Sequence, residues 1–188
     1  MDGRQGGFEI RVDGASPLFD KTGLEYQEFP SDYSRIRFFS MLLAKSAPQG
    51  VREANLLEQQ ISEIIKNAIK HGNKNDVAKK VRVWHKFTRD MAHLIVEDEG
   101  EGFQDLEDWN AFNRQRRRQV REQNYDELGK YASFRNNASD ETDGGNALFA
   151  AVEFWDAGLV FNEKRNAVAM KKLFNAKSGA SEPSTHGP

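Results

Sequence analysis

The chain has 188 residues, 27 basic and 29 acidic side chains, a formal net charge of −2 and no cysteine. This length is enough for one domain with a buried core. The balanced charge argues against a chain that binds nucleic acid or anionic lipid over its whole surface. The lack of cysteine excludes disulfides and thiolate metal sites.

Membrane and motif signals are also absent from the sequence. No apolar run approaches the roughly 20 residues that a membrane-spanning helix needs, and the N-terminal MDGRQGGFEIRVDG has no signal-peptide apolar region. We therefore expect a cytoplasmic protein with no membrane contact. The four histidines are scattered without metal-site spacing, and neither a GxxxxGK[ST] phosphate loop nor a GxGxxG fingerprint occurs.

The first part of the chain predicts two short strands and two helices. FEIRV at 8–12 and LEYQEF at 24–29 alternate as strands do. Ser31 is placed to cap the helix that follows. A second helix is expected from about 52 to 71, because apolar residues recur there with helical period and Gly72 can end it.

The middle of the chain predicts a hairpin and then a long polar insertion. VRVWHKF at 81–87 and HLIVED at 93–98 read as strands joined near Arg89. Residues 104–143 are rich in Arg, Gln, Asn and Asp and contain a short basic helix candidate at 112–123. Such length without a clear core face is typical of a functional or mobile insertion.

The last part predicts a helix and a second hairpin. GGNALFAAVEFW at 144–155 is a glycine turn feeding an apolar helix, and 158–162 and 167–174 read as paired strands. The tail from Asn175 is poor in apolar residues, and we expect it to be disordered. Hairpin-linked strands with helices available for one face predict an α+β two-layer sandwich.

Three segments contain residues suited to chemistry. On the second helix, Glu63, Asn67 and His71 lie four residues apart and form one polar stripe. An ordinary amphipathic surface helix would show the same stripe. The strand at 93–98 ends at Asp98, just before a turn with Gly100, where a carboxylate can accept a hydrogen bond from a ligand. An ordinary strand that ends in a turn would show the same pattern.

The third segment is the glycine pair before the apolar helix. Gly144 and Gly145 precede a helix N-terminus, whose free N–H groups and partial positive charge favour phosphate. The alternative is that Asp143 only caps this helix while the glycines make the turn.

Together and in this order, the three segments resemble the boxes of the GHKL (histidine-kinase-like) ATPases, a family of histidine kinases, gyrase-type ATPases and bacterial anti-sigma serine kinases. The first box, E-x-x-x-N-A-x-x-H-G, is matched by Glu63, Asn67, Ala68, His71 and Gly72. The second, D-x-G-x-G, is matched by Asp98, Gly100 and Gly102. The third, a glycine-rich turn opening a helix, is matched by Gly144, Gly145, Asn146, Ala147 and Leu148, with Ala147 where members commonly have glycine.

The resemblance implies a Bergerat-type ATP-binding fold, with a mixed, mostly antiparallel sheet and helices on one face. It covers roughly residues 24–174, with a lid insertion at 104–143, and leaves a partly loose N-terminal segment at 1–23 and the tail at 175–188. A sensor histidine kinase would need a dimerisation helix pair, for which the stretch before residue 24 is short. Gyrase and chaperone members carry large extra domains. The chain is therefore most similar to the anti-sigma-factor serine/threonine kinases.

That branch implies ATP and Mg²⁺ as cofactors, and a sigma factor and an anti-sigma-factor antagonist protein as partners. Direct nucleic-acid binding is not expected, and a homodimer would fit. By the resemblance, Asn67 supplies a metal ligand, Glu63 acts as general base toward a protein serine, and Asp98 accepts from the adenine amino group. Gly100 and Gly102 shape the pocket wall, and His71 with the turn at 144–147 contacts the nucleotide.

Two alternatives stay open. Nucleotide could switch affinity for a protein partner with little or no catalysis. The arginine run RQRRRQVR in the insertion could bind an acidic partner or nucleic acid, reach the phosphates, or be a solvated helix face that pairs with Glu122.

Overall fold

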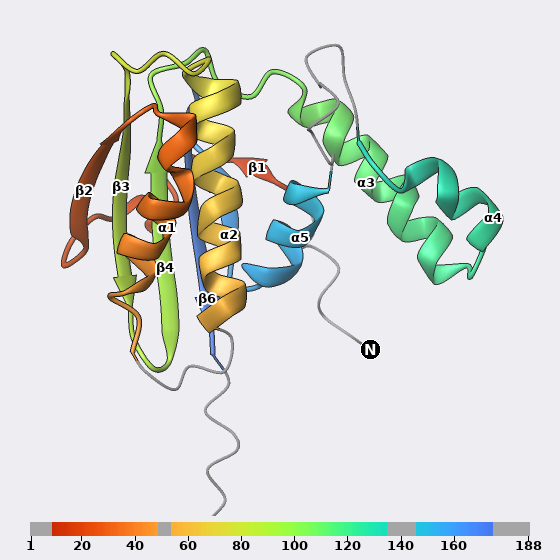
Figure 1. Cartoon of the computed structure of the whole chain (residues 1–188). Coiled ribbons are helices and arrows are strands. Elements are labelled where there is room, and N and C mark those ends of the chain that lie inside the picture. The colour runs from red at the N-terminus through yellow and green to blue at the C-terminus, as the bar shows by residue number, and fades with distance from the viewer. Residues whose placement is uncertain (1–8, 49–53, 135–145, 175–188) are drawn as a thin grey trace, which may run out of the picture.

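The computed structural model describes residues 9–48, 54–134 and 146–174. It contains one six-stranded sheet with the strand order β1-β5-β6-β4-β3-β2 (Figure 1). β1 pairs with β5 in parallel, and every other neighbouring pair is antiparallel. The strands are β1 Arg11–Val12, β2 Glu25–Pro30, β3 Lys80–Phe87, β4 Met91–Glu97, β5 Leu159–Phe161 and β6 Ala167–Leu173.

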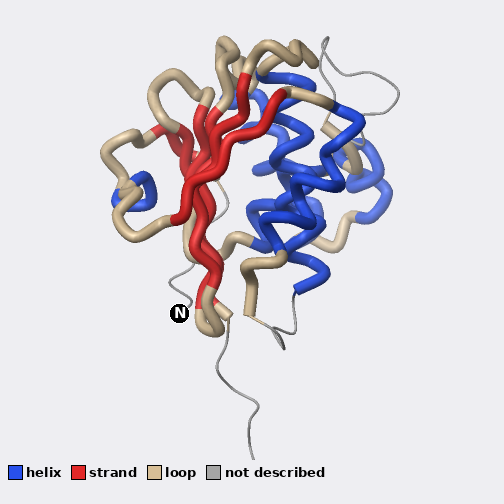
Figure 2. The backbone as a smooth tube through the Cα atoms, turned by 60° about the vertical axis from the view of Figure 1, so that its left-hand side comes forward, coloured by secondary structure: helices blue, strands red, loops and turns tan. Residues whose placement is uncertain are grey.

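The α-helices gather on one face of this sheet (Figure 2), whereas the short η1 turn packs on the other face. The α-helices are α1 Ile36–Ala44, α2 Ala54–Asn67, α3 Leu106–Arg121, α4 Tyr125–Leu128 and α5 Ala147–Phe154. The short segments are η1 Pro17–Phe19, η2 Tyr33–Arg35, the π-helical η3 Ala68–Gly72 and η4 Gly129–Tyr131. This arrangement confirms the expected α+β two-layer sandwich with a mixed, mostly antiparallel sheet.

The central strand β4 shows how the sheet separates two apolar layers. Leu94 and Val96 belong to the main core beneath the helices, whereas Ile95 between them belongs to a smaller cluster on the opposite face. Alternate side chains of a strand point to opposite faces, so the run of apolar residues in β4 serves both layers. Leu18 and Phe19 pack against the smaller cluster.

The N-terminal segment is therefore part of the fold from residue 9 onward. β1 adds to the sheet edge beside β5, and the Nε2 atom of His93 lies 2.8 Å from the carbonyl oxygen of Leu18. The strand expected at 8–12 exists but is shorter, and it lies before residue 24, where the resemblance begins.

The start of α1 differs from the prediction. Asp32, and not Ser31, is the N-cap of the η2 turn that leads into α1, and its carboxylate accepts from the Ser34 N–H at 3.0 Å. Ser31 is fully buried, and its hydroxyl accepts a hydrogen bond from the Asn73 side chain at 2.7 Å. A partner that lies 42 residues away in the sequence outweighs the local capping preference.

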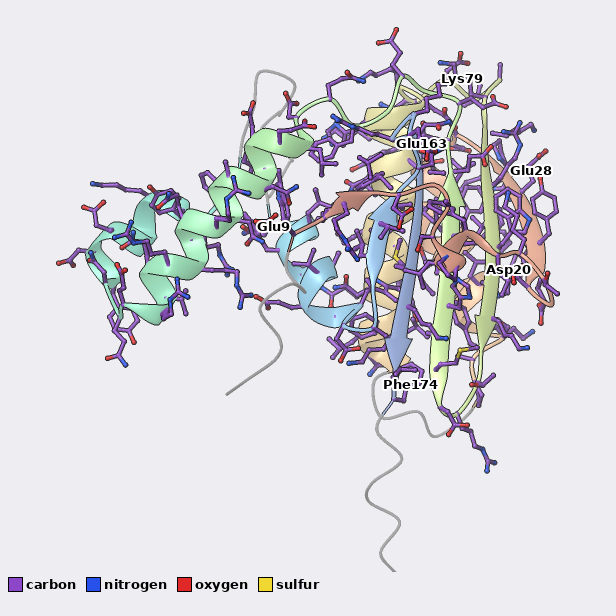
Figure 3. All side chains as sticks on the ribbon, turned by 180° about the vertical axis from the view of Figure 1, so that it is seen from behind. Glu9, Asp20, Glu28, Lys79, Glu163 and Phe174 are labelled. Carbon is purple, nitrogen blue, oxygen red and sulfur yellow. The ribbon has the colours of Figure 1, made fainter. Side chains whose placement is uncertain are left out.

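The insertion forms α3, α4 and η4, which extend away from the sheet (Figure 1). α3 starts six residues earlier than the helix expected at 112–123, because Leu106 and Trp109 are buried and Trp109 stacks on Phe149 of α5 with ring centroids 5.2 Å apart. Seen from behind, Glu9 lies beside α3 (Figure 3), and its carboxylate pairs with Arg114 at 3.0 Å.

Some predictions fall outside the described residues, namely the glycine pair Gly144 and Gly145 and the tail from Asn175. Across the three described ranges, no helix is both long enough and apolar enough to span a membrane.

Candidate functional site

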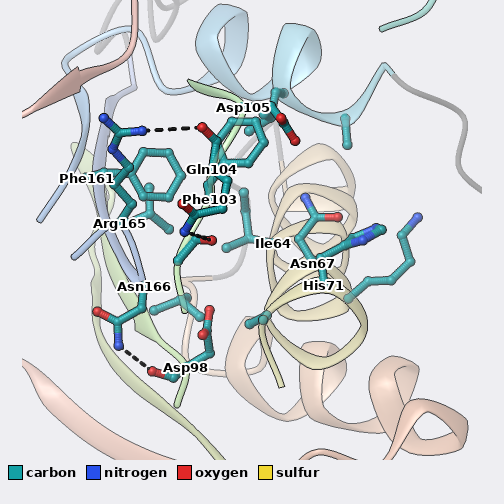
Figure 4. Close-up of a pocket in the computed structure, with 18 of the residues that line it drawn as sticks. Ile64, Asn67, His71, Asp98, Phe103, Gln104, Asp105, Phe161, Arg165 and Asn166 are labelled. Atoms are coloured by element: carbon teal, nitrogen blue, oxygen red, sulfur yellow. Dashed lines mark hydrogen bonds between the residues drawn. The ribbon is translucent and has the colours of Figure 1, made fainter. Parts of the chain in front are cut away.

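A cavity of about 510 Å³ lies on the helical side of the sheet. Its walls come from α2 and η3, from the loop after β4, from the first turn of α5 and from the β5–β6 hairpin. Figure 4 shows Asn67 and His71 facing this space from the helix, and Asp98 and Asn166 from the sheet side. The size lies in the range of small-molecule sites, which commonly combine apolar walls with few polar groups.

The polar stripe of the second helix faces the cavity. Glu63, Asn67 and His71 all line it, and so does Lys66. Lys66 Nζ lies 2.5 Å from Glu63 Oε2, and both side chains are only about one-quarter to one-third exposed, at 25% and 32%. The stripe continues through the π-helical turn of η3, an irregularity that is frequent at functional sites.

Asp98 is the partly buried carboxylate on the sheet side of the cavity. It follows the last residue of β4, and burial raises its pKa to about 6, although the Gly100 N–H donates to it at 2.8 Å and Lys164 also lowers the pKa. Its backbone is fixed by Asn166, whose side-chain amide donates to the Asp98 carbonyl at 2.6 Å. The carboxylate is thus rigidly placed and short of hydration, as expected of a group that awaits a hydrogen-bond donor.

The glycines of the first two boxes pack against each other. A Cβ atom on Gly72 would overlap the Asp98 carboxylate, and one on Gly100 would overlap the Gly72 carbonyl oxygen. Gly102 has a φ of +87°, and a Cβ there would overlap the Lys164 carbonyl oxygen of the β5–β6 hairpin. These contacts bring the end of η3 and the loop after β4 together, which explains why both motifs need glycine at these positions.

The sequence-predicted residues divide into three groups. Six of them line the cavity, namely Glu63, Asn67, His71, Asp98, Gly102 and Ala147. Gly100 is buried behind the Asp98 carboxylate and is not among the lining residues, and Asn146 is an exposed N-cap of α5 that does not line the cavity either. Gly144 and Gly145 lie outside the described residues.

Asn73 is a supporting residue that the sequence analysis missed. Its side chain is fully buried, donates to Ser31 Oγ at 2.7 Å and to the Lys80 carbonyl at 2.9 Å, and accepts from the Glu99 N–H at 2.7 Å. It thereby joins the end of η3 to the residue directly after Asp98. Its position next to Gly72 was visible in the sequence, but its three distant partners were not.

Arg165 is the second missed residue. It occupies the β5–β6 turn with a φ of +59° and lines the cavity. Its guanidinium donates to Oε2 of Glu107, in the first turn of α3, at 3.0 Å. It also donates to the carbonyl oxygen of Gln104, as Figure 4 shows. Phe103 and Phe161, with ring centroids 6.0 Å apart, add apolar wall beside it. The apolar rings and the Asp98 carboxylate suit a flat ligand that carries an N–H donor.

The arginines of the insertion lie outside the cavity. In the described part of the chain, none of them lines the cavity. Arg118 pairs with Glu122 one turn later at 2.9 Å, which is the intrahelical pair that the solvated-face alternative predicts. Arg114 and Arg116 pair with Glu9 and Glu153, at 3.0 and 3.6 Å. These acidic partners weaken the case for an arginine surface that reads nucleic acid.

The metal chemistry of the cavity follows from its donor set. Asn67 supplies a neutral amide oxygen, and the described residues contain no group of three or more His, Cys, Asp or Glu arranged for a metal ion. This set fits Mg²⁺, which prefers oxygen, keeps several waters and is often bound largely through a ligand's phosphates. The residues present therefore fit a polyphosphate ligand with its magnesium ion.

Comparison with known proteins agrees with this chemistry. A model of the family described as histidine kinase-, DNA gyrase B-, and HSP90-like ATPase matches residues 52–152, which is more than half of the chain. The match contains Glu63, Asn67 and Asp98. A search of curated proteins found no significant match. The chain therefore belongs to the family of histidine kinase-, DNA gyrase B- and HSP90-like ATPases, whose members bind ATP.

Proposed function

We propose that the chain is an ATP- and Mg²⁺-dependent protein-serine kinase that acts as an anti-sigma factor. In this proposal it phosphorylates an anti-sigma-factor antagonist protein and sequesters a sigma factor. The observation that carries the proposal is the convergence of Glu63, Asn67 and Asp98 on one cavity. The three boxes are common to the whole family, so the anti-sigma kinase branch is the finer part of this proposal and comes from the resemblance of the sequence to those kinases.

In the proposed binding mode, Asp98 holds the adenine. Its carboxylate accepts a hydrogen bond from the adenine amino group, while Phe103 and Phe161 provide apolar contact near the base. The phosphates then point toward α2, where the Asn67 amide oxygen would be a ligand of Mg²⁺. When bound, this ion neutralises phosphate charge during transfer and helps to orient the phosphates.

Glu63 takes the serine proton in this proposal. It lies one helical turn before Asn67 on the same face of α2, so its carboxylate stands beside the phosphate end of the cavity. Before the acceptor arrives, Lys66 holds this carboxylate at 2.5 Å. The serine hydroxyl displaces that contact and its oxygen attacks the terminal phosphorus of ATP. The bond from that phosphorus to the β–γ bridging oxygen breaks and releases ADP, while the serine proton moves to Glu63.

The test is transfer of labelled γ-phosphate to a purified anti-sigma-factor antagonist. Glu63→Gln should lower the rate at least about 100-fold while ATP still binds, because general-base catalysis is worth roughly that much. Asn67→Ala should lower both transfer and magnesium-dependent ATP binding. Glu58→Gln is the matched control, since Glu58 lies on the same helix outside the cavity lining and should leave transfer intact. Unchanged transfer in Glu63→Gln would remove the assigned role.

A second candidate is a nucleotide-switched binding module with little catalysis. It is favoured by the Glu63–Lys66 ion pair, which occupies the proposed base, and by Ala147 on the cavity wall where members commonly have glycine. Calorimetry with ATP, followed by product analysis after several hours, separates the two. Binding without phosphorylated protein, with the antagonist present, would favour the switch over the kinase.

A further inference from the structure

The outer side of α1 has a stripe of exposed apolar side chains that are not part of the core. Phe38, Met41 and Leu42 are 54%, 52% and 41% exposed. They lie three and four positions apart, so they follow one face of the helix. The opposite face, with Ile36, Phe39 and Leu43, is buried in the core. A helix that is apolar on both sides is normally covered on both sides.

The stripe is bordered by positive charge. Between Tyr33 and Pro48 the sequence has three cations, Arg35, Arg37 and Lys45, and no acidic residue. The Arg35 guanidinium stacks over the Phe38 ring at 5.3 Å, which brings this charge onto the stripe itself. Within the described ranges, no acidic side chain forms an ion pair with any of these three cations.

This surface is separate from the nucleotide cavity. α2 lies between α1 and α5 (Figure 1), and the cavity is on the α5 side of α2. None of the stripe residues lines the cavity. A ligand on α1 would therefore leave the nucleotide site accessible, and its binding is a property beyond ATP binding or phosphoryl transfer.

We infer that the outer face of α1, defined by Phe38, Met41 and Leu42 with Arg35, Arg37 and Lys45, docks an acidic amphipathic helix of a partner protein. An apolar stripe on such a helix would cover the three apolar side chains, and its flanking carboxylates would meet the three cations. A second copy of this chain fits less well, because two-fold pairing through this face would bring cations against cations.

The test uses synthetic helical peptides and the full chain. One peptide has a leucine stripe flanked by glutamates, and its twin has lysines in place of the glutamates. We expect saturable binding of the glutamate peptide in fluorescence anisotropy, and at least about tenfold weaker binding after Phe38→Ser with Met41→Ser. Arg37→Glu with Lys45→Glu should reverse the preference toward the lysine peptide. Leu173→Ser is the matched control, since Leu173 is 53% exposed on β6, and it should change nothing.

Several results would overturn the inference. Absence of saturable binding to the glutamate peptide would do so, and so would equal binding of the two peptides by the unaltered chain. Binding that survives the Phe38→Ser, Met41→Ser pair would place the contact elsewhere. A dimer in sedimentation that Met41→Asp converts to monomer would assign the face to a second copy. ATP calorimetry on the same variants should match the parent, so a failure here is separable from a failure of the kinase proposal.

Discussion

The protonation state of the Asp98 carboxylate is expected to affect the affinity for ATP. Burial raises its pKa to about 6, so the carboxylate is ionised above that pH and takes up a proton below it. An ionised acceptor forms the stronger hydrogen bond with the adenine amino group. We therefore expect the dissociation constant for ATP to rise as the pH falls from 7.5 to 5.5.

Asp98→Asn provides the control for this pH dependence, because the ATP phosphates titrate identically with both proteins. The variant should bind about tenfold more weakly at pH 7.5, since a neutral acceptor replaces a charged one. Its affinity should change less with pH than that of the parent. Calorimetric titrations at three pH values measure both effects, and parallel pH curves for the two proteins would refute the role of the carboxylate.

Gly102 gives a second prediction at the residue scale. With a φ of +87° and the Lys164 carbonyl oxygen where a Cβ would stand, Gly102→Ala must move the loop after β4 away from the β5–β6 hairpin. We expect a lower melting temperature and at least about tenfold weaker ATP binding. Gly129→Ala is the matched control, because a Cβ at Gly129 would meet nothing within 4 Å. Equal effects of the two substitutions would contradict this explanation.

At the scale of elements, the buried side-chain amide of Asn73 joins the end of η3 to the loop after β4. Asn73→Ala removes one hydrogen bond to the buried Ser31 hydroxyl and two partly buried bonds to the Lys80 carbonyl and the Glu99 N–H. The expected cost is about 2–4 kcal/mol of unfolding free energy in urea titrations. ATP affinity should fall as well, since the residue after Asp98 loses its anchor.

Asn55→Ala is the control for that substitution. Asn55 is exposed on α2, and its replacement should change stability by no more than about 0.5 kcal/mol. If Asn73→Ala were as mild as this control, the amide network would not hold the two elements together.

Elements with a clear period were predictable from the sequence, and those held by distant partners were not. The apolar spacing of α2 and the alternation in β3 mark both segments without knowledge of the fold. The start of α3 was missed because acidic residues surround Trp109, and only Phe149 of α5 explains why that indole is buried. Ser31 was assigned as a cap because its true partner is remote.

The same division applies to the site. Glu63, Asn67 and Asp98 sit in motifs of fixed local spacing, so a sequence can reveal them. Arg165 comes from a hairpin turn with no motif of its own, and it reaches the cavity only because the β5–β6 hairpin packs beside Gly102. Its ion pair with Glu107 joins positions 58 residues apart.

For the whole molecule, two buried histidines predict loss of stability in acid. Burial lowers the pKa of His85 and of His93 from the usual value of 6.5. Below about pH 6.5 the unfolded chain therefore binds protons that the folded chain does not, and the unfolding free energy falls with pH. Asp98 acts in the opposite sense, because its raised pKa lets the folded state bind a proton first between about pH 6 and 3.8.

Urea unfolding at pH 7.5, 6.5 and 5.5 measures this balance. Asp98→Asn removes the opposing contribution, so the stability of that variant should fall more steeply toward pH 5.5 than that of the parent. His93→Gln can keep a hydrogen bond to the Leu18 carbonyl without titrating, and it should flatten the decline. A stability that is constant from pH 7.5 to 5.5 in all three proteins would rule out this electrostatic account.

The most direct test of a single ATP–magnesium site is calorimetric titration with ATP, with and without Mg²⁺, on the parent chain and on Asn67→Ala. The parent should bind one ATP, more tightly when magnesium is present. Asn67→Ala should keep the magnesium-free affinity and lose the gain from the ion. An absence of ATP binding, or a magnesium effect of equal size in both proteins, would contradict the assignment of this cavity.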